Sequence, residues 1–327
     1  MEKQKRIPWL YFIFGAIVLV SWGTYMISTN SFHIYKDRWA APLTMIFGSF
    51  VGGATPEGGA AVAYPVFTLL LKISPDIARN FGFAIQSIGM TSASLLILGM
   101  GVKLDWNYIK YVTFSGFFGL IFGSYYIVPL ISPPLAKLFF VSLWLGFGIV
   151  LWRQNRSENR EVYDKIENLM RSDIVRLLIF GFLGGIISSI FGTGINIFTF
   201  CLMTIYYRVS EKVATPSSVI IMTIETLLGF FLHAKILNDF QEEAFYLWMT
   251  CVPVVLIFAP LGAFIVSRIN RKNVAKILYL VLIIQFVGAI IVIKPNLVQS
   301  LICFSIMICS ILLFTYLSKL SHRKEVG

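Results

Sequence analysis

The sequence predicts an all-α polytopic membrane protein, and three observations support this. Hydrophobic residues make up 57% of the 327 residues, and charged residues only 13%. A soluble globular domain typically carries about 25% charged residues. The apolar residues form a series of runs of roughly 20 residues, the length that a helix needs to cross a bilayer. Two of the runs, 47–65 and 180–200, are broken in the middle by glycines and small polar residues.

The formal net charge of +11 has a membrane explanation. The Lys and Arg residues lie between apolar runs, as expected for loops on the cytoplasmic side, so we predict contact with membrane lipid and no nucleic-acid partner. The four cysteines all fall inside apolar runs, without CxxC spacing or nearby metal-ligand residues. They are expected to be small buried hydrophobes, and neither a metal nor a cofactor is predicted.

The first half begins with a basic N-terminus and a first membrane helix over residues 9–28, which places the N-terminus in the cytoplasm. Residues 43–53 and 60–71 follow on either side of the first break. Each would be roughly 16–18 Å long as a helix, too short alone for a hydrocarbon core of about 30 Å. Ser74-Pro75 then marks a helix start. The remaining helices of this half are predicted over residues 76–100, 108–129 and 135–152.

Residues 153–173 are the longest polar stretch and form a cytoplasmic linker. Val162, Ile166, Leu169 and Met170 recur at helical spacing among charges, which predicts a short helix on the membrane surface. The second half repeats the order of the first. It contains a broken segment over 174–207, helices over 213–234, 244–266 and 274–293, then an extra helix over 297–317 and a basic tail.

The whole chain, 1–327, is predicted to be one membrane transport domain with two repeats, 42–152 and 174–293. Residues 73–78 align with 209–214, and residues 294–327 add the extra helix and tail. Loop charge suggests the topology. If each broken segment enters and returns on one side, every basic loop is cytoplasmic, both termini included, and the acidic loop 235–243 is outside. Three crossings then remain per repeat, which makes the repeats inverted.

The breaks carry the residues that could bind a ligand. Thr55-Pro56-Glu57-Gly58-Gly59 forms the first break, and Ser188-Ser189 with Gly192-Thr193-Gly194 forms the second. Helices that restart at the breaks would direct positive N-terminal ends toward a small anion, without a buried Arg or Lys. Close packing of helices is the alternative explanation for the glycines.

Glu57 and Glu225 are carboxylates at membrane depth and are candidates for proton coupling. A carboxyl group removed from water favours its neutral form, so each could take up and release a proton. The alternative is a neutral carboxyl held by a structural hydrogen bond. His233, near the outer end of its helix, fits an interface histidine better than a proton relay.

Further polar residues are expected to line the site from the helices that follow each break. The substrate-binding candidates are Thr55, Glu57, Gly58, Gly59, Asn80, Gln86, Ser189, Gly192, Thr193, Gly194, Asn196, Thr215, Ser217 and Ser218. Basic residues flank the ends of the broken segments, where they either attract anions or act as snorkelling anchors. These are Lys72, Arg79, Arg208 and Lys212.

The motifs resemble those of the TauE/SafE family of anion exporters. The resemblance covers residues 42–293 and rests on GGATPEGGAAVAYP (52–65), GGIISSIFGTGIN (184–196), and the helix starts ISPDIARN (73–80) and VSEKVATPSS (209–218). It implies a secondary transporter, not an enzyme, that exports a small anion by alternating access. Sulfite or an organosulfonate such as sulfoacetate is the implied substrate, and a bacterial inner membrane the implied location.

Two other functions stay open at this point. An integral-membrane enzyme could use Glu57 or His233 as acid or base, but no nucleophile or metal-ligand set accompanies them. An anion channel is the other alternative. The sequence is also compatible with a homodimer.

Overall fold

Helices are the only regular elements in the part of the chain that the computed structural model describes, residues 8–130, 133–156, 160–166 and 169–323. The first half contains α1 (Trp9–Ser28), η1 (Ser31–His33), α2 (Ile34–Arg38), α3 (Ala40–Ala54), α4 (Gly59–Pro65), η2 (Val66–Leu70), α5 (Pro75–Gly99), α6 (Trp106–Phe122), η3 (Gly123–Ile127), η4 (Val128–Leu130) and α7 (Pro133–Arg156). The second half contains α8 (Arg171–Phe191), α9 (Ile195–Cys201), η5 (Leu202–Tyr206), α10 (Glu211–Phe231), η6 (Leu232–Ile236), α11 (Glu242–Arg268), α12 (Arg271–Ile293) and α13 (Leu297–Arg323).

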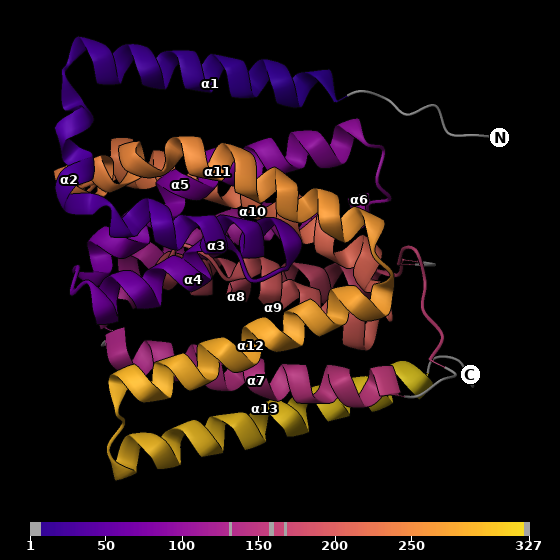
Figure 1. The fold of residues 1–327 in the computed structure, drawn as a ribbon. Coiled ribbons are helices and arrows are strands. Elements are labelled where there is room, and N and C mark those ends of the chain that lie inside the picture. The colour runs from indigo at the N-terminus through magenta and orange to yellow at the C-terminus, as the bar shows by residue number, and fades with distance from the viewer. Residues whose placement is uncertain (1–7, 131–132, 157–159, 167–168, 324–327) are drawn as a thin grey trace.

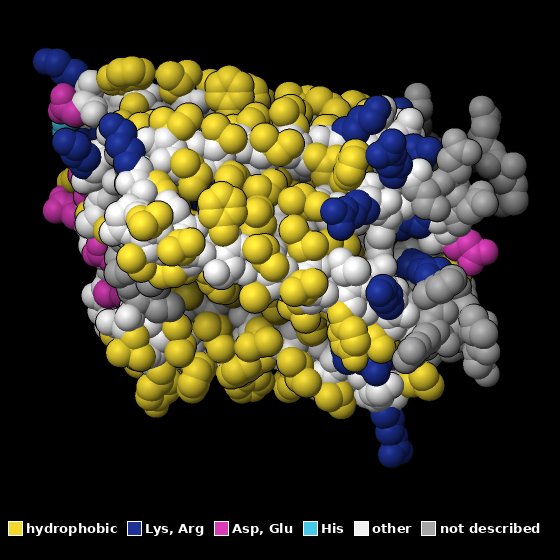
Figure 2. All heavy atoms as spheres, turned by 90° about the horizontal axis from the view of Figure 1, so that it is seen from below, with side chains coloured by type: hydrophobic (Ala, Val, Ile, Leu, Met, Phe, Trp, Pro, Cys, Tyr) yellow, Lys and Arg dark blue, Asp and Glu magenta, His cyan; other side chains and the backbone are white. Residues whose placement is uncertain are grey.

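Nine helices in these ranges are long and apolar enough to cross a membrane. Their axes lie roughly parallel or antiparallel to one another across the molecule (Figure 1). Figure 2 shows hydrophobic side chains over the middle of one face, with most Lys and Arg at the end where α1 begins and α13 ends. The predicted class, an all-α polytopic membrane protein, is therefore confirmed.

Two ends of the molecule are distinguished by their loops. The linker end carries residues 160–166, and the Asp239 end carries the loop between η6 and α11. At each end, a carboxylate at the start of a helix accepts a hydrogen bond from a residue of the loop or linker there. Asp76 at the start of α5 accepts from Gln241 at 2.7 Å, at the Asp239 end. Glu211 at the start of α10 accepts from Arg160 at 2.9 Å, at the linker end.

The first broken segment folds back on itself. The 15 residues of α3 extend about 22 Å and end at Ala54. The chain then turns, and Gly59 at the start of α4 lies directly against Gly48 of α3. Phe47 near the start of the segment and Leu70 at its end line the same groove. The segment thus enters from the Asp239 end and returns toward it (Figure 1).

The second broken segment folds back from the opposite end. Its first helix, α8, has 21 residues and stops at Gly192, whose φ of 74° is left-handed. The hydroxyl of Tyr207, past the end of the segment, donates to the carbonyl of Asp173 near its start, at 3.4 Å. Arg160 of the linker donates to the carbonyl of Thr204 at 2.6 Å. This segment therefore begins and ends at the linker end, although α8 alone is long enough to cross a bilayer.

The two segments finish with the same local structure. Each ends in a π-helical turn, η2 or η5. Lys72 and Arg208 follow with left-handed φ angles of 56° and 52°. The next residue donates its N–H to a carbonyl in the π turn at 2.9 Å in both cases, Ile73 to Phe67 and Val209 to Met203.

Glycines allow two pairs of helices to pack closely, as membrane helices do when small residues face each other. In the α3–α11 pair, a Cβ at Gly262 would overlap the carbonyl oxygen of Phe50. In the α6–α8 pair, a Cβ at Gly119 would overlap the carbonyl oxygen of Phe182. Each pair joins a helix of one half to the broken segment of the other.

The linker is not the surface helix that the spacing of its apolar residues predicts. Its described residues are irregular, apart from one parallel bridge between Tyr163 and Val209. The N–H of Ile166 donates to the Asp105 carboxylate at 2.6 Å, and the Ile166 side chain is buried. The N–H of Ile166 and the guanidinium of Arg160 bond to neighbouring helix ends, whereas Glu161, Asp164 and Lys165 are exposed.

The outermost helices are attached by few polar contacts. Trp22 of α1 donates to the carbonyl of Met249 in α11 at 2.8 Å. Ser310 of α13 donates to the carbonyl of Leu143 in α7 at 2.7 Å. These two helices match the predicted flanking helices at residues 9–28 and 297–317, and α13 is longer than predicted.

The close packing of the two pairs can be tested with Gly262→Ala. We expect overpacking to lower the free energy of unfolding by about 1–3 kcal/mol. Thermal unfolding of the detergent-solubilised protein is the measurement. The matched control is Gly23→Ala in α1, where a Cβ would meet nothing within 4 Å. The control should be neutral or slightly stabilising, and an equally stable Gly262→Ala protein would contradict the packing argument.

Candidate functional site

The two breaks meet in the interior of the molecule. Asn196, one residue into α9, donates from Nδ2 to the carbonyl of Pro56 at 2.6 Å. Thr193 in the second break donates to the carbonyl of Glu57 at 3.3 Å. All four residues lie in or beside a break, and the three polar side chains among them are fully or almost fully buried. The backbone of the first break is thus completed by side chains of the second.

The helices that follow the breaks close around this contact. Gln86 of α5 donates from Nε2 to the carbonyl of Gly192 at 2.8 Å. Met222 of α10 places its sulfur 3.1 Å from Nδ2 of Asn196. Gly58, with a φ of 82°, lies between them, and a Cβ there would collide with Gln86, Met222 and Thr193. Each half therefore contributes a break and a helix to one buried cluster.

Several N–H groups at the breaks are already bonded to the protein's own side chains. Asn196 Oδ1 accepts from the N–H of Gly194 at 3.1 Å, and Ser188 Oγ accepts from that of Ile195 at 2.9 Å. In the first break, Thr55 Oγ1 accepts from the N–H of Glu57 at 3.2 Å. In this structure these three N–H groups are bonded within the protein and are not available to an anion. The predicted anion binding by free helix N-termini therefore lacks these three donors.

Glu57 is completely buried beside the contact of the breaks. Its Oε2 accepts a hydrogen bond from Nε2 of Gln285 in α12 at 3.1 Å. Its Oε1 has no hydrogen-bond partner among the described residues. An ionised carboxylate in such a place needs a nearby positive charge or a proton.

A positive charge is present, and the sequence analysis did not predict it. Lys137 in α7 is only 3% exposed and interacts electrostatically with the Glu57 carboxylate. Its ammonium lies 5.2 Å from the ring centre of Phe140. The sequence analysis expected an anion site that needs no buried Arg or Lys, and the structure adds a buried lysine that interacts with a residue of the first break. A lysine near the start of an apolar run resembles a snorkelling anchor, and only the folded position shows that it points inward.

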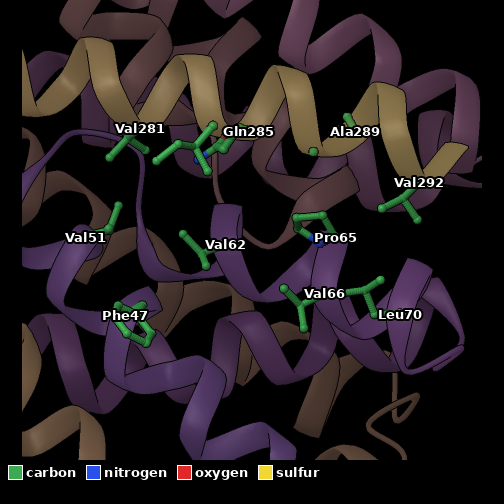
Figure 3. Close-up of a pocket in the computed structure, with 12 residues that line it drawn as sticks. Phe47, Val51, Val62, Pro65, Val66, Leu70, Val281, Gln285, Ala289 and Val292 are labelled. Atoms are coloured by element: carbon green, nitrogen blue, oxygen red, sulfur yellow. The ribbon is translucent and has the colours of Figure 1, made fainter.

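An apolar groove lies beside Gln285, the hydrogen-bond partner of Glu57 (Figure 3). It has a volume of about 370 Å³, and its walls come from α3, α4, η2 and α12. Gln285 is the polar residue in a lining otherwise formed by hydrophobic side chains and Gly288. The groove thus reaches the hydrogen-bond partner of Glu57, and an amphiphilic ligand could approach from the membrane.

Glu225 lies on the other side of the second break. It is 3% exposed, its carboxyl group lies near Ser188, and its Oε1 has no hydrogen-bond partner among the described residues. Gly116 of α6 makes room for it, because a Cβ there would lie 2.9 Å from Glu225 Oε2. Ser188 accepts from Ile195 at the start of α9. Glu225 is thus tied to the second break, whereas Glu57 belongs to the first.

Charged residues form a separate cluster at the Asp239 end. Arg79 is 6% exposed and pairs with Asp239 at 3.3 Å, so it is not the snorkelling anchor considered above. Asn80 donates to the carbonyl of Asp239 at 2.8 Å and to Gln241 at 3.0 Å. The buried ring of His233 contacts Asp239 at 2.8 Å. This cluster joins α5 of the first half to a loop of the second.

A second charged cluster closes the linker end. The fully buried Glu211 carboxylate pairs with Arg160 at 2.9 Å and with Arg271 at 3.4 Å. Asn155 of α7 donates to Glu211 at 2.9 Å. Burial lowers the pKa of Arg160, and the Glu211 carboxylate opposes that shift. The cluster joins the linker and α7 to α10 and α12.

The structure brings together nine of the fourteen substrate-binding candidates around the contact of the breaks: Thr55, Glu57, Gly58, Gly59, Gln86, Gly192, Thr193, Gly194 and Asn196. The others lie elsewhere. Asn80 belongs to the Asp239 cluster, and Ser189 faces η3. Ser217 accepts from the N–H of Asp105 at 3.0 Å, Ser218 bonds within α10, and Thr215 lines a small space near the linker end.

Comparison with protein families identifies the chain. The model of the sulfite exporter TauE/SafE family matches residues 40–289, well over half of the chain. This chain belongs to the TauE/SafE family. A search of curated proteins and a search of solved structures each gave no match.

Family membership and the nine apolar helices together make this a multi-pass membrane protein of a transporter family. The predicted family is confirmed, over nearly the same residues as the resemblance in the sequence. The matched region spans both breaks and the helices that close around them, and it includes Lys137.

Gly58→Ala tests how closely the first and second breaks pack against each other. We expect a loss of thermal stability in detergent, because a Cβ would be strained at positive φ and would collide with the second break. Gly101→Ala is the matched control, because Gly101 also has a positive φ, of 64°, but nothing within 4 Å. Gly58→Ala should cost more than Gly101→Ala, and equal losses would show that strain alone matters.

Proposed function

We propose that this TauE/SafE family member is a secondary transporter that exports a small anion, sulfite or an organosulfonate such as sulfoacetate, by alternating access. The observation that carries the proposal is the meeting of two helix breaks that enter from opposite ends of the molecule. Broken helices that converge in this way are typical of transporter binding sites near the bilayer midplane. The substrate would bind beside this contact, near Glu57.

We infer that the two halves are inverted repeats. Each has a helical hairpin with a central break and a π-helical end, followed by three long helices. The hairpins open toward opposite ends, as an inversion requires. Halves related in this way can rock against each other around a fixed centre, which exposes the site to one side at a time.

The charged clusters would act as the two barriers of such a cycle. Arg79 and Asp239 hold the Asp239 end, while Glu211 with Arg160 and Arg271 holds the linker end. Both clusters are formed here, which would make this a state closed on both sides in the proposed cycle. Opening toward either side would separate the ion pairs of one cluster and leave the other intact.

Glu57 is the residue that we propose for proton coupling. Its carboxyl group is buried, lies beside the break contact and has one oxygen without a partner among the described residues. A group in this position can exchange its proton only when the site opens to water. Glu225 is a second candidate, at the other break.

Transport should require the ionisable carboxyl of Glu57. In proteoliposomes loaded with sulfite, we expect saturable efflux that a pH gradient alters. Glu57→Gln should reduce the efflux rate by about 10-fold or more, which corresponds to at least about 1.4 kcal/mol. Glu242→Gln is the control, because Glu242 is an exposed carboxylate at the start of α11. Linear, unsaturable flux would favour a channel, and no flux with sulfite or any sulfonate would contradict the proposed substrate class.

The proposed orientation places both termini and the linker end in the cytoplasm, with the Asp239 end outside a bacterial inner membrane. Lys235→Cys and Lys272→Cys, both at exposed positions, test it in a Cys309→Ser background. In intact cells a membrane-impermeant maleimide should label Lys235→Cys, and it should label Lys272→Cys only after permeabilisation. The reverse pattern would invert the topology.

A further inference from the structure

Lys137 is a buried cation without a direct partner. It makes no hydrogen bond or ion pair with the residues that the structure describes. Its ammonium lies 5.2 Å from the centre of the Phe140 ring, and it interacts electrostatically with the Glu57 carboxylate. Arg79 and His233, the other buried basic residues in the described membrane helices, both contact Asp239. A buried ammonium without a hydrogen-bonded counter-ion is costly, so it is expected to serve a ligand.

The surroundings of Lys137 suit the charged head of an anion. Glu57 interacts electrostatically with Lys137, and its Oε2 accepts a hydrogen bond from Gln285 and not from Lys137. The aromatic ring of Phe140 stabilises the ammonium through its π face, without competing for the N–H donors. The donors of Lys137 are therefore available to an incoming sulfite or sulfonate oxygen.

Charge balance then limits what can happen on binding. Lys137 and the ionised Glu57 together are neutral. A monovalent anion added to this buried pair leaves one excess negative charge, which an apolar site disfavours strongly. One proton on Glu57 removes the excess.

We propose that Lys137 binds the charged head of the transported anion, and that Glu57 takes up one proton from the aqueous side as the anion binds. The inference rests on the proposed function. The Glu57 carboxylate accepts the proton on an oxygen and returns it to water when the anion leaves. Anion and proton consequently move in the same direction, and the site alternates between two neutral states.

Few other groups can take part in this exchange. Cys201 of α9 interacts electrostatically with Glu57, but its thiol is fully buried and donates to the carbonyl of Ile197 in its own helix. Gln285 of α12 faces Glu57 and does not ionise. Lys137 is the charged residue that faces Glu57 from α7. Glu225 lies near Ser188 at the second break and shares no hydrogen bond with this pair among the described residues.

Calorimetric binding of methanesulfonate, whose charge does not change with pH, tests the proposal on the full-length protein in detergent. Titrations in two buffers of different ionisation enthalpy give the number of protons taken up. For the wild type we expect one proton per anion, and an affinity that falls by about 10-fold per pH unit while Glu57 is ionised. Lys137→Met should weaken binding by about 30-fold or more, and Lys137→Arg, which keeps the charge, should bind better than Lys137→Met.

Glu57→Gln separates the two parts of the proposal. It should bind methanesulfonate without proton uptake and without pH dependence, because glutamine resembles the protonated carboxyl group. Lys110→Met is the matched control, because Lys110 on α6 also lies over an aromatic ring, that of Tyr111 at 5.5 Å, but is exposed. Size-exclusion profiles and thermal unfolding check that each variant is folded.

The outcomes are distinct. Wild-type affinity in Lys137→Met would overturn the role of Lys137, and proton uptake that persists in Glu57→Gln would overturn the role of Glu57. If Lys137→Met does not fold, Lys137→Gln takes its place with the same expected loss, and wild-type affinity in that variant or pH-independent binding by the wild type would overturn the proposal. Efflux by the wild type alongside either result would leave the proposed function standing. A wild type that neither binds nor transports sulfite or any sulfonate would overturn the proposed function itself.

Discussion

An interrupted helix in an apolar medium leaves backbone N–H and C=O groups without water, and here each half of the chain donates hydrogen bonds to the break of the other half. Asn196 and Thr193 donate to carbonyls of the first break, and Gln86 donates to a carbonyl of the second. Pulling the breaks apart would leave those buried groups unpaired, at about 1–3 kcal/mol each. Any movement of the halves must therefore pivot about the contact and open the molecule at its ends.

The placement of charge follows the same logic. At both ends, buried charges are directly paired, as with Glu211 and Arg160 or Arg79 and Asp239. Pairs of this kind are poor general stabilisers, because the desolvation of two ions offsets much of their attraction. They suit barriers, which have to form and break at moderate cost. In the centre, Lys137 and Glu57 balance each other at longer range, and that arrangement leaves donors and acceptors available to a ligand.

A structural feature could be predicted from the sequence where its signal lies within a short stretch of residues. Apolar length and the breaks themselves are local, so the membrane fold and the first half of the site, from Thr55 to Gly59, could be predicted. Whether a side chain points into the protein or away from it is not a local property, because it depends on which helices pack around it. Lys137 lies near a helix start, as a snorkelling anchor would, but its side chain is buried. Ile166 belongs to a set of apolar residues at helical spacing, yet it is buried against the ends of neighbouring helices. Asn80 follows a break in sequence, yet the loop at Asp239 takes up its hydrogen bonds.

Gln285 gives the proposed coupling a route to movement. It lies in α12 of the second half, whereas Glu57 and Lys137 belong to the first, so its hydrogen bond to Glu57 crosses between the halves. An ionised carboxylate accepts from the amide nitrogen, but a protonated one also has a proton to donate, which only the amide oxygen can receive. Proton uptake therefore changes the hydrogen bonding between the halves at the position where the anion is proposed to bind. In the proposed cycle, the charge of the substrate and the hydrogen bond between the halves would both act on the Glu57 carboxyl group.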